Sequence, residues 1–240
     1  MNQILKKSLW IFILAVILLG VPRLSGVIAD LFNYHTIDPD GSYAWITVHH
    51  LAQAIIFLLI IALISKFKRL NYGFSWGNIE AGKNYVLSFT LIFAAGSIAS
   101  HVITFLTNAF QPFPYPLTSV NIFGQLGFQL FLSGPSEELI FRAFAITLLA
   151  LSIRGRFLKG KVSYANFIAA IIFGLAHVKF SFAPCAAEYS LYQVFLSVTL
   201  GIFYGDCYEK TGSVYYPMIM HSISNVVMVS LTVIASLLLK

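Results

Sequence analysis

Long apolar runs alternate with short hydrophilic gaps along most of the chain. A helix needs about 20 mostly apolar residues, at about 1.5 Å per residue, to cross the hydrocarbon core of a bilayer. The pattern therefore predicts an all-α fold, a polytopic transmembrane helical bundle of about seven spans. The predicted spans are Leu5–Val21, Ala44–Ser65, Tyr85–Thr107, Val120–Ile153, Ala165–Phe180, Tyr189–Tyr204 and Val214–Leu239.

The fourth predicted span, residues 120–153, is too long for one straight crossing. Near its middle stands the run Ser-Gly-Pro-Ser at positions 133–136, which is typical of a helix end or a helix start. We therefore expect a broken fourth segment, in which two helical pieces meet at this run. If Pro135 begins the second piece, Glu137 lies in its first turn, where the helix dipole favours a carboxylate.

The composition excludes a water-soluble protein. Of the 240 residues, 58% are hydrophobic and only 10% are charged, whereas an average soluble domain has about 25% charged residues. Lipid must therefore be the solvent for most of the surface. The length suits a single membrane domain over residues 1–240. Within it, we expect variable N-terminal spans in residues 1–119 and the core with the candidate chemistry in residues 120–239.

The net charge of +6 does not indicate a nucleic-acid partner. The basic residues stand in the gaps between apolar runs, where positive charges set the orientation of a membrane protein. With the N-terminus inside, eleven Lys and Arg residues lie in inner segments and three in outer segments, which predicts a cytoplasmic N-terminus. The eleven are Lys6, Lys7, Lys66, Lys68, Arg69, Lys83, Arg154, Arg156, Lys159, Lys161 and Lys210.

Several ionisable side chains stand inside the predicted spans. Such groups cost several kcal/mol in hydrocarbon unless they are paired or face a cavity. Glu138 and Arg142 are four residues apart, so they share one helix face and are expected to form a buried ion pair. Glu137 is turned about 100° away from that face and is left to face something else.

Two further spans carry a histidine with a partner four residues away. His177 shares a helix face with Phe173, and His221 shares one with Asn225. A carboxylate, two imidazoles and a carboxamide that point inward from separate helices can activate a water molecule and stabilise an oxyanion. We therefore expect His177 and His221 to face one another across the cavity that Glu137 faces.

The depths of Glu137, His177 and His221 in the membrane, counted along their spans, differ. Counted at about 1.5 Å per residue from the inner ends of their spans, Glu137 lies about 24 Å deep, His177 about 18 Å and His221 about 11 Å. A longer inner extension after Ile153 or strong tilting of the helices would bring them together.

The other histidines have ordinary explanations. His101 is expected to be a packed, hydrogen-bonded residue, and His49 and His50 are expected to lie at the membrane interface, at the edge of the second span. Glu137, Glu138 and Arg142 could also form no more than a polar clamp between helices. Their occurrence together with two histidine-bearing spans disfavours that reading.

Three short motifs resemble those of a known family. The run EELIFR, from Glu137 to Arg142, resembles the EExxxR motif of the CAAX-protease and bacteriocin-processing family, abbreviated CPBP and also called Abi. The runs FGLAH at 173–177 and HSISN at 221–225 resemble its FxxxH and HxxxN motifs, in the same order. The resemblance covers roughly residues 126–228. It departs from the family at Ala143, where glycine is frequent.

The resemblance implies an enzyme, because this family comprises intramembrane endopeptidases, including those that cut the last three residues from prenylated CaaX proteins. It implies that Glu137 is the general base that activates water and that His177 holds this water or a metal ion. It implies that His221 and Asn225 stabilise the oxyanion, or that His221 binds the metal. Glu138, Arg142 and Phe173 would then support the site structurally.

The residues leave the use of a metal open. Two histidines and a glutamate could bind Zn²⁺ with one open position, with His177 and His221 as tentative ligands. The H-E-x-x-H spacing of helical zinc proteases is absent, so the site could equally be metal-independent. The expected partners are the lipid bilayer and a peptide or lipid-anchored protein substrate. The expected location is a bacterial plasma membrane, which the chain would cross several times.

Two other functions fit the same residues. A non-catalytic bacteriocin-immunity or scaffold protein of the same fold could retain them. A proton-coupled transporter could use Glu137 as a relay carboxylate, but transporters often have paired halves with matching broken helices. Only one break is predicted in this chain, at positions 134–135. We therefore favour an intramembrane protease of the metallo- or glutamate type.

Overall fold

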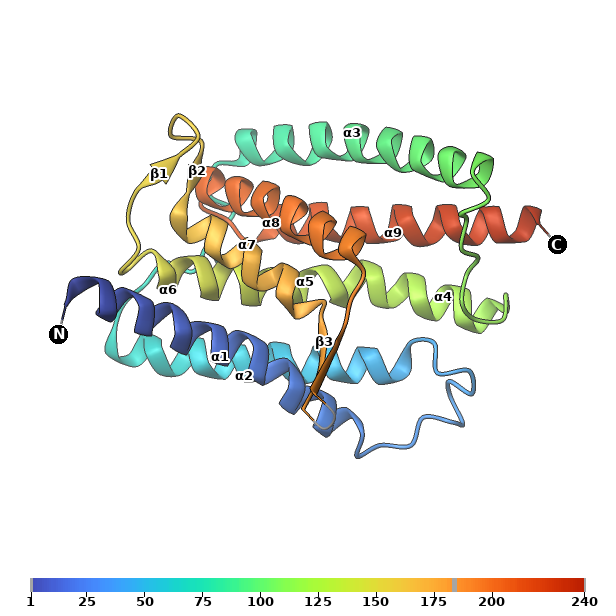
Figure 1. The fold of residues 1–240 in the computed structure, drawn as a ribbon, viewed down its shortest axis with the longest axis horizontal. Coiled ribbons are helices and arrows are strands. Elements are labelled where there is room, and N and C mark those ends of the chain that lie inside the picture. Colours follow the sequence, from blue (N-terminus) through green and yellow to red (C-terminus); the bar gives the residue numbers. More distant parts are fainter. Residues whose placement is uncertain (1, 183–184, 240) are drawn as a thin grey trace.

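The computed structural model describes residues 2–182 and 185–239 as one bundle of helices that lie side by side (Figure 1). Every segment that the hydropathy pattern predicts to span contains helix, so the all-α bundle is confirmed. The two chain ends lie at opposite ends of the bundle (Figure 1). The long helices are α1 (Gln3–Ala29), α2 (Ala44–Phe67), α3 (Ile79–Leu106), α8 (Leu191–Thr211) and α9 (Tyr215–Leu238).

Within the described residues, four helices are long and apolar enough to cross a membrane. They are α1, α2, α3 and α9. Helix α8 has sufficient length but is more polar, because its last turns hold Asp206, Glu209 and Lys210. The composition of the long helices agrees with an integral membrane protein.

The fifth predicted span, Ala165–Phe180, is wrong in its last part. Helix α7 (Tyr164–Ala176) has 13 residues, so it is about 20 Å long and shorter than the roughly 30 Å hydrocarbon core. The chain then forms strand β3 (Lys179–Phe182), which pairs antiparallel with β4 (Cys185–Glu188). A smaller hairpin of β1 (Arg156–Phe157) and β2 (Val162–Ser163) precedes α7.

The fourth segment is helical from Ser119 to Leu149. Two of its pieces meet at the predicted run, where one ends at Ser133 and the next begins at Gly134, but no gap in the helix separates them. The backbone at Ser133 and at Glu138 has helical dihedral angles. Pro135 has no N–H to donate, so the regular α-helical hydrogen bonding is interrupted there. The chain stays helical because π-helical turns flank the short helix that contains Pro135. The parts are α4 (Ser119–Phe128), the π-helix η1 (Gln129–Ser133), α5 (Gly134–Glu138), the π-helix η2 (Leu139–Ile146) and α6 (Thr147–Leu149). Glu137 does lie in the first turn of α5, but that turn is not a free helix end.

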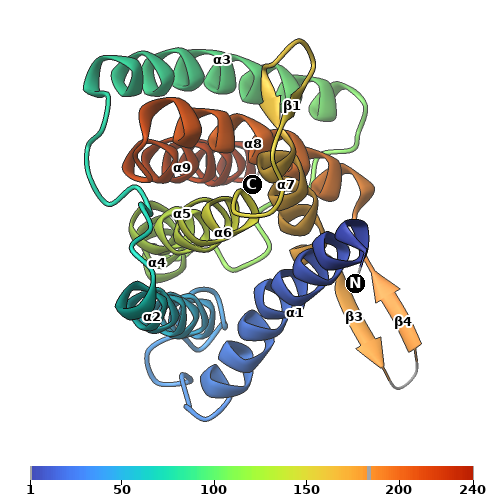
Figure 2. The ribbon, with the colours of Figure 1, turned by 90° about the vertical axis from the view of Figure 1, so that its left-hand side faces the viewer.

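This irregular segment lies in the middle of the bundle. Figure 2 shows α4–α6 between a layer with α1 and α2 and a layer with α8 and α9, with α3 outermost. All eight residues of η2 are buried. Helix α5 approaches α9 closely, since a Cβ atom at Gly134 would lie only 2.8 Å from the backbone nitrogen of Ser222. This contact brings the two glutamates of α5 beside His221.

The loop between α1 and α2 is held by one buried carboxylate. Asp38 accepts hydrogen bonds from the backbone N–H groups of Ser42, Tyr43 and Ala44 at 2.8, 2.7 and 2.7 Å. Because a helix start leaves its N–H groups without partners, Asp38 acts as a cap for α2. Burial alone would raise the pKa of Asp38, but these three backbone hydrogen bonds outweigh burial and lower the pKa below its ordinary value.

We expect Asp38→Asn to lower the free energy of unfolding by about 1–3 kcal/mol at neutral pH, because a neutral amide replaces a charged acceptor. The pKa of Asp38 in the folded state lies below the unfolded value of about 3.9. The stabilisation is therefore complete above the unfolded pKa and is lost as the pH falls through the folded pKa.

Thermal unfolding in one detergent, from neutral pH downward, tests this expectation. Wild type and Asp38→Asn should converge in acid, and Glu188→Gln, which changes an exposed carboxylate on β4, should follow wild type. A gap between wild type and Asp38→Asn that stays constant with pH would contradict the prediction.

Candidate active site

Glu137 lies between two imidazole rings from different helices. Its Oε1 is 3.8 Å from Nε2 of His50 on α2, and its Oε2 is 3.8 Å from Nε2 of His221 on α9. The glutamate side chain is 18% exposed, whereas the adjacent Glu138 is fully buried. The carboxylate of Glu137 therefore has one oxygen toward each histidine and remains accessible to a small molecule such as water.

The ring of His221 is oriented by Glu138. Nδ1 of His221 lies 2.7 Å from Oε1 of Glu138. A carboxylate can only accept a hydrogen bond, so Nδ1 carries the hydrogen and Nε2 is left toward Glu137. The ring also stacks on Tyr204, with 5.1 Å between ring centroids, and meets the edge of Phe173 at 6.0 Å.

The predicted ion pair between Glu138 and Arg142 is confirmed. Nε of Arg142 lies 3.0 Å from Oε2 of Glu138, and both side chains are buried. Arg142 also donates to the carbonyl of Gly201 at 3.2 Å and lies over the rings of Phe173 and Tyr204. The sequence predicted this ion pair and no further partner for Glu138. The structure adds one, because the second oxygen of Glu138 binds His221.

His177 lies directly after the last residue of α7 and is partly exposed. Its Nδ1 is 2.9 Å from the carbonyl oxygen of Phe173. A carbonyl also only accepts, so this ring carries its hydrogen on Nδ1 and has an unprotonated Nε2 when neutral. The ring of Phe173 contacts His177 and His221 at centroid distances of 5.0 and 6.0 Å, so both imidazoles lie against the same side chain.

Asn225 lies one turn after His221 on α9. Its Nδ2 donates to Oγ of Ser133 at 3.0 Å. Ser133 ends the π-helix η1 that leads into α5. The carboxamide is therefore held near the start of the helix that carries Glu137, and the second hydrogen on Nδ2 can serve another acceptor.

The expectation that His50 lies at the membrane interface is wrong. His50 is 7% exposed, its Nδ1 lies 2.7 Å from Oγ of Ser136, and its Nε2 faces Glu137. A signal for this burial exists in the sequence, since His50, Phe57 and Ile61 recur at helical spacing and are all buried on α2. The pattern shows which face of α2 is buried but does not show what that face packs against.

His101 is packed and hydrogen-bonded, as predicted. Its Nδ1 contacts the carbonyl oxygen of Ser97 at 2.9 Å, and its Nε2 contacts Oγ1 of Thr232 at 3.2 Å. This histidine therefore joins α3 to α9 and has a structural environment.

The residues present do not fit a zinc centre as they are arranged. Among residues 2–182 and 185–239, no group of three or more His, Cys, Asp or Glu side chains is placed to hold a metal ion. The tentative ligands His177 and His221 belong to no such group in this part of the chain. We therefore derive no chemical step through a metal.

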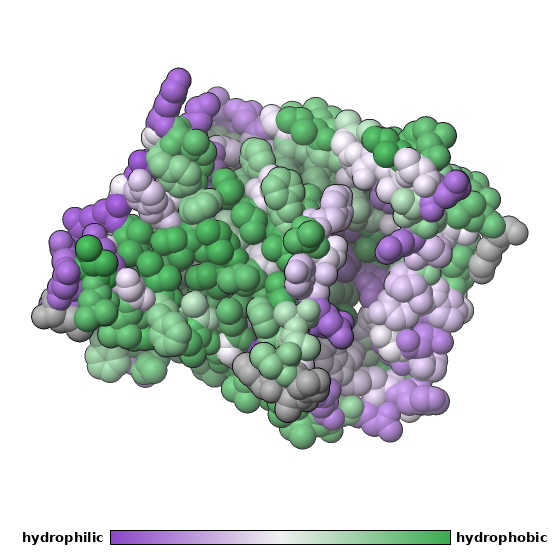
Figure 3. All heavy atoms as spheres, viewed as in Figure 1, coloured by the Kyte–Doolittle hydropathy of each residue, from purple (hydrophilic) through white to green (hydrophobic). Residues whose placement is uncertain are grey.

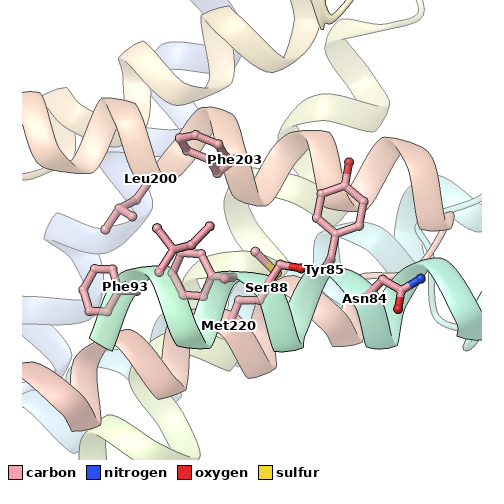
Figure 4. Close-up of a pocket in the computed structure, with 9 residues that line it drawn as sticks. Asn84, Tyr85, Ser88, Phe93, Leu200, Phe203 and Met220 are labelled. Carbon is pink, nitrogen blue, oxygen red and sulfur yellow. The ribbon is translucent and has the colours of Figure 1, made fainter. Parts of the chain in front are cut away.

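Two hollows differ in character. Figure 3 shows a hollow beside the β3–β4 hairpin with hydrophilic side chains inside it, between a mainly hydrophobic part of this face and a part with many hydrophilic residues. A separate cavity of about 460 Å³ between α3, α8 and α9 is lined mostly by apolar side chains, including Phe89 and Met220 (Figure 4). Tyr204 packs between Phe89 and His221, with ring centroids 5.5 and 5.1 Å away. The apolar cavity therefore has an aromatic wall between it and the glutamates.

The fold and the site together define an α-helical integral membrane protein with a glutamate–histidine site enclosed by its helices. Residues 119–227 match the family model described as Type II CAAX prenyl endopeptidase Rce1-like. This segment belongs to the CPBP family, so the resemblance inferred from the three motifs is confirmed. The match supports intramembrane endopeptidase activity in general. No curated protein and no solved structure matches the chain.

The buried ion pair predicts a specific pattern of stability. Removing one partner leaves the other charge buried and unpaired, which typically costs about 3–5 kcal/mol. We expect Glu138→Gln and Arg142→Gln each to lower the thermal unfolding midpoint. The double variant should be more stable than at least one single variant, because it contains no stranded charge.

The four proteins should be unfolded in the same detergent. Additive losses in the double variant would show that the two side chains are not coupled. If Glu138→Gln instead unfolds like wild type and is inactive, then Glu138 and not Glu137 carries the chemistry.

Proposed function

We propose that the protein is an intramembrane endopeptidase that hydrolyses a peptide bond in a membrane-associated or prenylated, CaaX-type polypeptide. The observation that carries the proposal is the accessible carboxylate of Glu137, which is held between His50 and His221 inside an apolar bundle. The CPBP family of residues 119–227 supports the reaction type.

Glu137 is the general base in this proposal. A water molecule near Oε2 can give one hydrogen to that oxygen and direct the other toward the unprotonated Nε2 of His177. As the water oxygen attacks the carbonyl carbon of the scissile bond, its proton moves to Glu137. Glu137 then returns the proton to the departing amine nitrogen, so the same group acts as base and acid.

Asn225 and His221 are proposed to stabilise the oxyanion. One hydrogen on Nδ2 of Asn225 goes to Ser133, and the second can be donated to the negatively charged oxygen. His221 can donate from Nε2 only when its ring is protonated. The carboxylate of Glu138 at Nδ1 stabilises that charged form, so Glu138 supports the chemistry through His221.

The orientation of the chain is part of the proposal. The N-terminus, the β1–β2 hairpin and the α2–α3 connection lie at one end of the bundle (Figure 1). Lys6, Lys7 and Arg154 line one surface hollow at this end. Because positive charges collect on the cytoplasmic side of membrane proteins, we assign this end to the cytoplasm.

We expect Glu137→Gln to lower the rate of cleavage by at least about 10²-fold, the usual contribution of a general base. The change removes the proton acceptor and keeps the size of the side chain, so the thermal unfolding midpoint should change little. Release of the C-terminal tripeptide from a prenylated CaaX peptide by purified protein measures the effect. Glu80→Gln, which changes an exposed acid on α3, is the matched control. Turnover near the wild-type rate in Glu137→Gln would refute the role of Glu137.

A glutamate-and-water mechanism also predicts independence from metal. After dialysis against a strong chelator and verification that metal is absent, the purified protein should cleave the same peptide at the same rate. Loss of activity that added Zn²⁺ restores would contradict the metal-independent mechanism and would return His177 and His221 to the role of ligands.

A further inference from the structure

One histidine beside the glutamate lies outside all three motifs and outside the matched segment. His50 belongs to α2, and its ring meets the ring of Phe128 edge-on, with 4.9 Å between centroids. Its two nitrogens face consecutive residues of α5, Nδ1 toward Ser136 at 2.7 Å and Nε2 toward Glu137 at 3.8 Å. The buried ring is therefore held in a defined orientation against the helix that carries the base.

The Nδ1 partners distinguish His50 from the other two histidines of the site. The partner of His177 is a carbonyl oxygen and the partner of His221 is a carboxylate, and both groups can only accept. Those two rings therefore have no hydrogen on Nε2 when they are neutral. The partner of His50 is a hydroxyl, which can donate as well as accept.

The hydroxyl hydrogen of Ser136 has two acceptors within reach. Nδ1 of His50 lies at 2.7 Å, and the carbonyl oxygen of Ser133 lies at 3.1 Å. The hydroxyl has one hydrogen and cannot donate fully to both acceptors. The shorter contact and the negative charge of Glu137 beside Nε2 favour donation to His50, which gives up the longer bond to Ser133. Neutral His50 then carries its hydrogen on Nε2, which is the atom that faces Glu137. Of the three histidines, His50 can thus present an N–H to the base without becoming charged.

We propose that His50 is a positioning residue for Glu137. Its Nε2–H holds Oε1, and Oε2, on the side of His221, is left to take the proton from water. The proposal rests on the role of Glu137 as the general base. The 3.8 Å separation is longer than a hydrogen bond, and catalytic contacts in ligand-free sites are often long and tighten when substrate binds. A carboxylate anchored through one oxygen keeps the other aimed at the reacting water.

Three substitutions separate the two contacts of His50. His50→Leu removes both, His50→Gln retains an amide N–H close to the position of Nε2, and His50→Asn retains an amide close to the position of Nδ1. We expect His50→Leu to lower kcat about 10- to 100-fold, as for a lost hydrogen bond to a charged group, with KM nearly unchanged. His50→Gln should recover most of the lost kcat, and His50→Asn should not.

His101→Gln is the matched control, because it changes another intramembrane histidine that bonds to Thr232 rather than to the site. It should keep the kcat of wild type. A wild-type kcat in His50→Leu would overturn the proposal. Equal recovery by His50→Asn and His50→Gln would also overturn it, because the contact with Ser136 would then be the important one.

A second measurement does not depend on turnover. Wild type and His50→Gln, labelled with nitrogen-15 in the histidine rings, are compared by NMR in the same detergent, and the resonances absent from the variant belong to His50. A protonated Nε2 supports the proposal, and a neutral ring with its hydrogen on Nδ1 overturns it. If wild type cleaves no prenylated peptide while Nε2 of His50 is protonated, the prenylated class of substrate in the proposed function fails and the hydrogen placement toward Glu137 stands.

Discussion

The buried ion pair between Glu138 and Arg142 is the interaction on which the arrangement of this site depends. Neither charge is tolerable alone in the interior of a membrane protein, so each requires the other. Arg142 is also held by the carbonyl of Gly201 and by two aromatic rings, and Glu138 extends the contact to His221. One pair therefore links the central segment to α7, α8 and α9 and sets the direction of an imidazole at the same time.

Two adjacent glutamates serve different purposes because their surroundings differ. Glu138 points into the packed interior and has its charge compensated, whereas Glu137 is turned away from that face and is partly exposed. The short α-helical turn between η1 and η2 preserves the separation of about 100° between neighbouring side chains. The close approach at Gly134 then places α9 against this turn. A base needs access to water, and a buried structural charge must be shielded from it, so this segment satisfies both requirements at consecutive positions.

The N-terminal helices belong to the environment of the base, although the family match begins at residue 119. Helix α2 contributes His50 to one side of Glu137, and helix α3 contributes Phe89 to the aromatic wall behind His221. Changes in α2 therefore act directly on the surroundings of Glu137. Changes in α3 act through Tyr204, which stacks on His221.

The sequence by itself determined that most of the surface faces lipid, that the fold is helical and that Glu138 pairs with Arg142. These features depend on local properties, namely hydropathy summed over a span and the spacing of residues along one helix. The three motifs likewise identified Glu137, His177, His221 and Asn225 as the candidate site, and the structure places them on the central segment, on α9 and just after α7.

Only the tertiary structure decided how these elements meet, because depth counted along separate spans takes no account of where each helix begins. His221 does meet the glutamates, since its Nδ1 lies 2.7 Å from Glu138 and its Nε2 lies 3.8 Å from Glu137. The place of His50 beside Glu137 was decided in the same way, since hydropathy reports that a face is buried but not which helix covers it.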